Sequence, residues 1–173
     1  THTPDPVPIH LIGEASSRTR PGDAPDLFGT LCMYGPTVAE VRSYQTFRLV
    51  YTCGKLGIDD TGGIRIALRK VTDAGLLQVT DPTAANYVSV SSSGAGRLIP
   101  SYDHDGGQRP WSGVLTITQQ GGYLKPGETI EIILGDTRGG GPGFMLHTFV
   151  DGGSGFRPMA DVQATGVYEP LPD

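Results

Sequence analysis

The chain is short of cysteine, aromatic side chains and positive charge: its 173 residues include 2 Cys, 8% aromatic residues and a formal net charge of -5. Lys and Arg stand singly rather than in a basic stripe, which makes the phosphate backbone of nucleic acid a poor partner. No run of about 18 apolar residues occurs, which excludes a membrane-spanning helix. We therefore expect neither nucleic acid nor a membrane among its partners.

The two cysteines, Cys32 and Cys53, are too few for a disulfide framework. Two interpretations stay open: both are small buried residues on neighbouring strands, or one disulfide closes the loop between them. On the loop-entropy treatment such a disulfide would stabilise the fold by roughly 3 kcal/mol. Further soft ligands do not accompany either cysteine in the sequence, so we expect no metal site and no cofactor.

Glycine and proline are plentiful, at 26 and 14 residues, and helical periodicity is weak. This combination predicts short strands joined by many turns. We expect one domain over 1–173, with a loop-rich segment at 1–43 and the start of a linker at 169–173. The chain begins at Thr1 without a leader pattern, so we expect a processed or excised piece of a longer protein, from a compartment that the sequence leaves undetermined.

Alternation of apolar and polar residues predicts a series of strands. They are expected at 46–52, 64–71, 87–91, 113–118, 129–134, 144–150, 159–162 and 167–168, with a further short one at 9–12, and 94–107 is expected to be irregular. No βαβ spacing appears, so the prediction is an all-β antiparallel β-sandwich, immunoglobulin-like or jelly-roll, with long Gly/Pro-rich loops. The inward-facing residues are predicted to be Phe47, Leu49, Ile64, Ile66, Leu68, Leu115, Ile117, Ile130, Ile132 and Leu134.

The most distinctive loop follows the predicted strand 129–134 and contains five glycines and one proline between positions 135 and 143. Glycines allow a backbone to approach a partner closely, and Asp136 and Arg138 add one charge of each sign. We predict that Asp136 accepts hydrogen bonds that fix the loop. We also predict that Arg138 projects toward a carboxylate-bearing ligand or a neighbouring domain.

Arg109 and Trp111 form a second candidate binding group, because the single Trp lies beside an Arg just before a predicted strand. A Trp face can bind a sugar ring or a partner's side chains, and it can equally cap the core of the sandwich. His147, in the predicted strand 144–150, is a third candidate, although a His on a strand more often packs or forms hydrogen bonds than binds a ligand.

Complete catalytic or metal motifs are missing from the sequence. Asp103-His104-Asp105-Gly106 resembles the start of a calcium loop, but the third acid is missing and Val114 stands where a bidentate Glu is needed. A loop-built hydrolase or lyase stays an alternative function, with Asp136, Arg138, His147 and Asp161 as its acid/base set. Convergence of these four groups would favour the enzyme, and their dispersal would favour a binding module.

Four segments carry a resemblance to a known family: Tyr51-Thr52-Cys53-Gly54 leading to Gly57-Ile58-Asp59-Asp60 and Gly63-Ile64-Arg65-Ile66-Ala67; Asp81-Pro82 with Ala85-Asn86-Tyr87-Val88; Arg109-Pro110-Trp111; and Gly122-Tyr123-Leu124 through Leu134-Gly135-Asp136 to Pro142-Gly143 and Thr148-Phe149. In order and spacing they resemble the N-terminal β-rich region of bacterial proteins of the DUF3604 type. The resemblance covers about residues 44–173. It implies an accessory domain that lacks the metal-hydrolase machinery, with a PHP-like metal-dependent hydrolase domain following it.

The sequence therefore favours a non-catalytic accessory or ligand-binding β-sandwich module. It would pack against a hydrolase domain of the same protein or bind a small or carbohydrate-like ligand. Asp136, Arg138, Arg109, Trp111 and His147 are the predicted binding residues.

Overall fold

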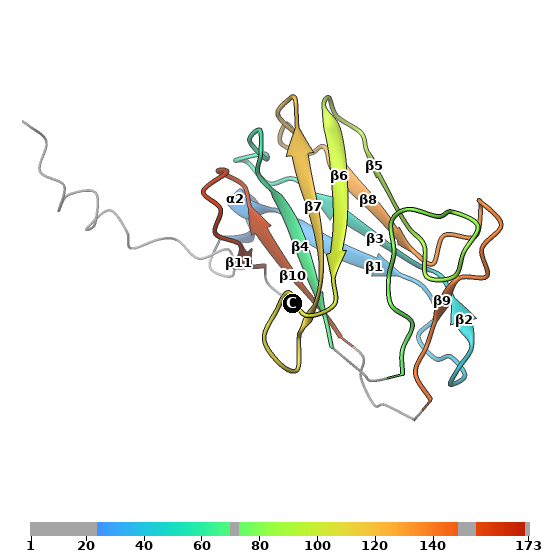
Figure 1. Ribbon diagram of the computed structural model, residues 1–173. Coiled ribbons are helices and arrows are strands. Elements are labelled where there is room, and N and C mark those ends of the chain that lie inside the picture. The colour runs from blue at the N-terminus through green and yellow to red at the C-terminus, as the bar shows by residue number, and fades with distance from the viewer. Residues whose placement is uncertain (1–23, 70–72, 149–154, 172–173) are drawn as a thin grey trace, which may run out of the picture.

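The chain folds into layered antiparallel β-sheets, as the computed structural model shows for residues 24–69, 73–148 and 155–171 (Figure 1). The predicted all-β sandwich is confirmed. The strand expected at 9–12 lies outside the described residues. Within them, no helix is long and apolar enough to cross a membrane.

Two larger sheets form the layers, and a two-stranded ribbon lies beside them (Figure 1). The first sheet has the order β1 (Thr30–Tyr34), β3 (Phe47–Thr52), β8 (Thr129–Leu134), β5 (Val88–Ser92). The second has the order β11 (Glu169–Pro170), β10 (Phe156–Asp161), β4 (Gly63–Leu68), β7 (Gly113–Gln120), β6 (Arg97–Asp103). The ribbon pairs β2 (Tyr44–Gln45) with β9 (Phe144–Met145), and a single helical turn, α2 (Pro25–Phe28), precedes β1.

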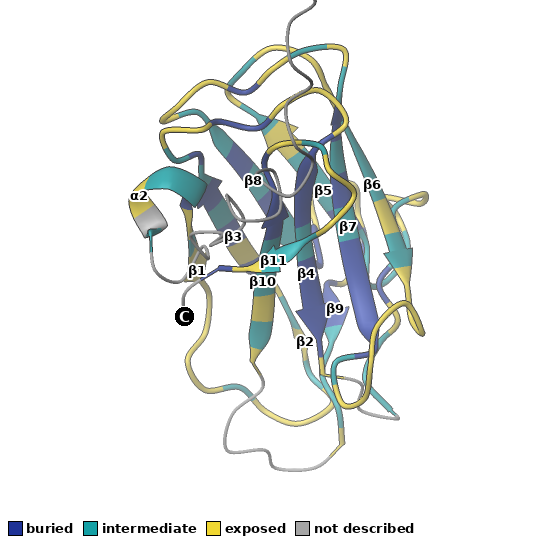
Figure 2. Ribbon diagram, turned by 90° about the vertical axis from the view of Figure 1, so that its left-hand side faces the viewer, coloured by how far each residue is buried: buried dark blue, intermediate teal, exposed yellow. Residues whose placement is uncertain are grey.

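The core lies between the two sheets, where alternate residues of the central strands meet (Figure 2). In β3 and β8 buried positions alternate with less buried ones, as a strand with one face on a core requires. Ile66, Leu115 and Ile132 have no exposed surface. All ten residues predicted to face inward are buried, so the assigned phase of each strand is confirmed.

The strand registers define two ends of the sandwich. Leu134 of β8 lies opposite Phe47 and Val88, and Asp136 follows it, so we call this the Asp136 end. The ring of Phe47 packs edge-to-face on Phe156, with 6.1 Å between centroids, which brings the start of β10 to the same end. β10 runs away from it to Asp161, which lies opposite Gly63, and we call that end the Asp161 end.

Several expected boundaries need correction. The segment 1–43, expected to be loop-rich, contains α2 and β1, and the segment 94–107, expected to be irregular, contains β6. The strand expected at 144–150 is the two-residue β9, with 146–148 outside any strand and 149–150 outside the described residues. At the C-terminal side, Glu169 and Pro170 pair with β10 and Leu171 is buried, so 169–171 belong to the sandwich rather than to an unpaired linker.

The two cysteines are free, and their surroundings differ. Cys53 is buried at the end of β3, and burial, with a smaller contribution from Glu128, raises the pKa of its thiol to about 12. Cys32 lies exposed in the middle of β1. The interpretation of a small buried residue therefore holds for Cys53 and is wrong for Cys32, and the structure contains no disulfide between them.

Candidate functional site

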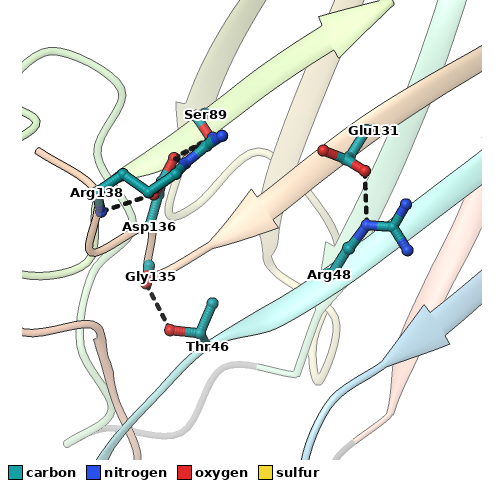
Figure 3. Close-up of polar contacts among 7 residues, drawn as sticks. All are labelled: Thr46, Arg48, Ser89, Glu131, Gly135, Asp136 and Arg138. Carbon is teal, nitrogen blue, oxygen red and sulfur yellow. Dashed lines mark hydrogen bonds and ion pairs between the residues drawn. The ribbon is translucent and has the colours of Figure 1, made fainter.

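The site begins at Gly135, directly after β8, where the backbone turns with a φ of 72°. A Cβ at this position would lie 2.2 Å from the backbone nitrogen of Phe144, so no other residue fits without displacing that strand. The N–H groups of Gly135 and Asp136 both donate to the carbonyl of Tyr87, each at 2.9 Å. The hydroxyl of Thr46 donates to the Gly135 carbonyl at 2.9 Å (Figure 3). The turn is thereby attached to the segments that precede β3 and β5.

The carboxylate of Asp136 is the centre of the site, and its side chain is 6% exposed. Its Oδ1 accepts the backbone N–H of Arg138 at 3.0 Å, and Oδ2 accepts the hydroxyl of Ser89 at 2.5 Å (Figure 3). The Arg138 side chain adds Nε–Oδ1 at 3.0 Å and Nη2–Oδ2 at 2.6 Å, the two-pronged geometry that suits a guanidinium and a carboxylate. The predicted role of Asp136 as an acceptor that fixes the loop is present in the structure.

These contacts keep Asp136 ionised. The hydrogen bonds from the Arg138 side chain, with a smaller contribution from Ser89, hold the pKa of the Asp136 carboxyl well below its usual range, although burial acts in the opposite direction. A carboxylate with a lowered pKa and with donors on both oxygens is a weak general base. The geometry therefore supports a structural role for Asp136 rather than proton transfer.

The glycines of the loop allow close packing on the segment 81–86. A Cβ at Gly139 would lie 2.5 Å from the carbonyl oxygen of Pro82, and one at Gly141 would lie 2.5 Å from that of Ala84. Asn86 completes the attachment: its N–H donates to the Gly143 carbonyl at 2.8 Å, and its Oδ1 accepts the N–H of Met145 at 2.9 Å. The loop is therefore packed on a neighbour along its length and is not a free hairpin tip.

Arg138 combines a fixed position with a large exposed surface. Its side chain is 70% exposed, although Nε and Nη2 are hydrogen-bonded to Asp136 and Nη2 also lies 3.2 Å from the Ser89 hydroxyl. Arg48 and Glu131, joined by a 2.6 Å ion pair, lie on the neighbouring strands of the same sheet (Figure 3). The expectation that Arg138 simply projects outward needs refinement, because it folds back on Asp136 and exposes only the remaining edge of its guanidinium.

Trp111 lies away from this group. The guanidinium of Arg157 stacks 4.5 Å from the centre of its ring, and a Cβ at Gly155 would be 3.3 Å from the ring edge. The connection between β6 and β7, which carries Arg109 and Trp111, belongs to the second sheet, and Figure 1 shows it apart from the loop after β8. Arg109 is exposed in this connection. The structure thus does not bring this pair together with Arg138, and one face of the Trp ring is already occupied.

His147 follows β9 and is half-buried. Its carbonyl accepts the N–H of Arg42 at 3.0 Å, which ties this stretch to the segment before β2. The partners of the Asp136 carboxylate are Arg138 and Ser89, and His147 is not among them. The prediction that His147 lies in a strand is wrong, because 146–148 follow the two-residue strand β9 and are outside any strand.

Asp161 lies at the opposite end of the sandwich from Asp136. Its buried carboxylate accepts the N–H groups of Thr165 at 2.9 Å and Gly166 at 2.6 Å, which closes the turn between β10 and β11. The hollow of about 260 Å³ beside it is lined by Phe28, Leu56, Val162 and Val167 among others. Of the four groups of the enzyme alternative, Asp136 and Arg138 meet, His147 is not among the hydrogen-bond partners of Asp136, and Asp161 lies at the opposite end of the sandwich. Among the described residues, no three His, Cys, Asp or Glu side chains are gathered as metal ligands would be.

Ser89 is the residue of the site that sequence reasoning missed. Alternation in the strand around 87–91 indicates that Ser89 faces away from the core, but nothing local says which residue lies across from it. The partner is 47 positions away and is set by the pairing of β5 with β8.

No family model matches the chain, and no curated protein or solved structure is similar enough to it to identify a relative.

Proposed function

We propose that this chain is a non-catalytic accessory module of a larger bacterial protein and that Arg138 recognises a carboxylate of a neighbouring domain. One observation carries the proposal: the Arg138 guanidinium is held by a buried carboxylate and yet its side chain is 70% exposed. A cation that is already oriented loses little freedom when it binds, so such an Arg is well suited to recognition.

The free part of the guanidinium supplies the binding geometry. Its hydrogen bonds to Asp136 and Ser89 use Nε and Nη2. Because a guanidinium is planar and its donors form a fork, Nη1 is directed away from the Asp136 carboxylate. A carboxylate approaching from solvent meets this nitrogen and the exposed side of Nη2. The anchored loop beneath it would then act as a rigid support.

A neighbouring domain fits this surface better than a sugar does. Arg48, with a side chain 49% exposed, and Glu131 lie on the same face of the first sheet, so the surface offers charges of both signs. A carbohydrate platform would need an open aromatic face beside Arg138. Arg157 stacks on one face of the single Trp, and the Arg48 guanidinium lies 5.2 Å from the ring centre of Tyr34 on the first sheet.

Membership of the DUF3604 type is part of the proposal and rests on the four segments quoted above. In the larger protein, a PHP-like metal-dependent hydrolase domain would follow Asp173, and it would supply the catalytic residues. The separation of Asp136 and Asp161 at opposite ends of the sandwich supports such a division of labour.

The test begins with the polypeptide encoded directly after Asp173 in the same gene. Titration calorimetry of this polypeptide with the present chain should show binding, and Arg138→Ala should weaken it by about tenfold or more, as removal of an interface charge pair does. Arg97→Ala is the matched control, since Arg97 is also exposed but lies at the start of β6, at the Asp161 end. A gene that ends at Asp173, or binding that Arg138→Ala leaves unchanged, would contradict the proposal.

A further inference from the structure

The outer edges of the two larger sheets differ in how they are protected. An edge strand exposes unpaired backbone groups, and proteins usually shield it with charge, proline, shortness or a covering segment. β6 contains Arg97, Pro100 and Asp103, and β11 is two residues long and includes Pro170. β5 and β6 are joined by the short segment 93–96 and lie against each other, which closes that side of the sandwich (Figure 1).

Among the residues that the structure describes, β1 has none of these protections. Its five residues, Thr30–Tyr34, are uncharged and contain no proline, and within the described residues it pairs with β3 and with no other strand. Met33 is 52% exposed and Tyr34 is 54% exposed. In the part of the chain that the structure describes, the remaining side of β1 is therefore an open edge with apolar side chains on it.

The hydrogen-bond pattern of β3 shows which backbone groups point to that edge. Cys53, directly after β3, donates to the carbonyl of Glu128 at 2.8 Å and accepts from Gly127 at 2.9 Å, so its backbone faces β8. The direction alternates along a strand, so Tyr51 also faces β8 and Val50 faces β1.

The pairing of β1 with β3 determines which backbone groups of β1 point to the free edge. Cys32 lies opposite Val50, so the backbone groups of Cys32 point to β3. Leu31 and Met33, its neighbours on either side, then direct their N–H and C=O groups outward. The free edge presents two outward-facing residues arranged symmetrically about Cys32.

We propose that a second copy of this chain pairs with β1 antiparallel about Cys32, which joins the two four-stranded sheets into one. In this register Leu31 of each copy exchanges backbone hydrogen bonds with Met33 of the other. Cys32 lies opposite Cys32, and Thr30 lies opposite Tyr34. No charge meets a like charge within the paired strands, because the strand has none.

A second copy suits this edge because the strand is complementary to itself. The twofold pairing satisfies all four outward backbone groups of Leu31 and Met33 in each chain and covers the exposed Met33 side chain. A five-residue strand buries much less surface than the roughly 1,200–2,000 Å² of a stable interface. The dimer is therefore weak and dependent on concentration.

Cys32 provides the means of trapping it. The two Cys32 residues form a non-hydrogen-bonded pair, with Cα atoms about 4.5 Å apart, a separation that a disulfide can span. Diamide oxidises the two thiols to a disulfide and is itself reduced to the hydrazine. The chain should form a covalent dimer on a non-reducing gel, Cys32→Ser should abolish it, and the buried-thiol control Cys53→Ser should retain it.

A second pair of variants tests the register. In a Cys32→Ser background, Thr30→Cys and Tyr34→Cys should give little dimer separately and a heterodimer when mixed. Met33→Lys should remove the rise of average mass with concentration in sedimentation without disturbing the bonds of β1 to β3. A dimer of either single-cysteine variant with itself, a dimer that Met33→Lys leaves unchanged, or a chain that stays monomeric and untrapped near millimolar concentration would overturn the proposal.

Discussion

Asp136 and Asp161 are both buried carboxylates at the end of a strand, but they meet different partners. Asp136 accepts one following N–H, from Arg138, together with the guanidinium of the same residue. Asp161 accepts the N–H groups of Thr165 and Gly166 and the hydroxyl of Thr165, all of them neutral donors. The first arrangement fixes a loop and displays a cation, whereas the second only closes a turn.

The difference shows how a glycine-rich loop can become a rigid support. Ordering such a loop costs about 1–2 kcal/mol of backbone entropy per residue, and glycines bring no side chains to offset it. Asp136 supplies several strong acceptor contacts at one point, while close packing of Gly139 and Gly141 on 81–86 holds the remainder. The charge of Arg138 lies at the surface as a consequence of this attachment.

The largest expected loss of stability comes from a substitution in the core between the two sheets, which supports both ends of the sandwich. Ile66 has no exposed surface and lies in the central strand β4. Ile66→Ala should lower the free energy of unfolding by about 2–5 kcal/mol, the usual range for a buried aliphatic site that is emptied. Urea denaturation measures it, and a loss below about 1 kcal/mol would show that the site relaxes around the missing atoms.

The strands and core could be predicted from sequence because their signal is local. The strand 129–134 has the predicted bounds, and the alternation at Ile64, Ile66 and Leu68 gives the correct inward face. β1 and β6 were missed because both are edge strands: β1 is exposed at four of its five residues, and β6 contains Pro100, which an edge tolerates.

The site could be predicted only in part, for a related reason. Asp136 and Arg138 are two positions apart, so their contact is a local matter. The Ser89 hydroxyl, the carbonyl of Tyr87 and the hydroxyl of Thr46 reach them through strand pairings across the sheet. The separation of Asp161 from Asp136 depends on strand pairings as well, which no short motif encodes.

The next prediction compares the loss of stability when either buried carboxylate is removed. Asp136→Ala and Asp161→Ala should each lower the free energy of unfolding by about 1–3 kcal/mol, since both leave donors without their buried acceptor. The local consequences should differ: hydrogen exchange should quicken at 135–143 in the first variant and at 162–166 in the second. Exchange that quickens over both loops in both variants would show that the ends are coupled.

Acid should weaken the contribution of the Asp136 carboxylate to stability. The folded-state pKa of Asp136 lies below its unfolded value, so its contribution is complete above the unfolded pKa near 3.9 and is lost as pH falls toward the folded pKa. The stability difference between the wild type and Asp136→Asn should therefore shrink as urea denaturation is repeated from pH 6 down to pH 2. A difference that stays constant over this range would show that the charge of Asp136 contributes nothing.

The smallest change in stability is expected for Arg138→Ala. This variant removes the exposed cation, which is the feature that distinguishes the Asp136 end from the Asp161 end. The Arg138 end of this ion pair is 70% exposed and therefore screened by solvent, so its loss should lower the free energy of unfolding by about 1 kcal/mol, less than the loss of the buried Asp136 carboxylate. In this variant the Asp136 carboxyl loses the partner that does most to lower its pKa, so this pKa should rise toward the ordinary value. Carbon-detected NMR of the Asp136 side chain can follow the move of its titration to higher pH. Arg97→Ala serves as the control and should leave that titration unchanged. If Arg138→Ala destabilises the chain as much as Asp136→Ala does, the guanidinium is a structural part of the loop like the donors around Asp161, and its role in recognition loses its physical basis.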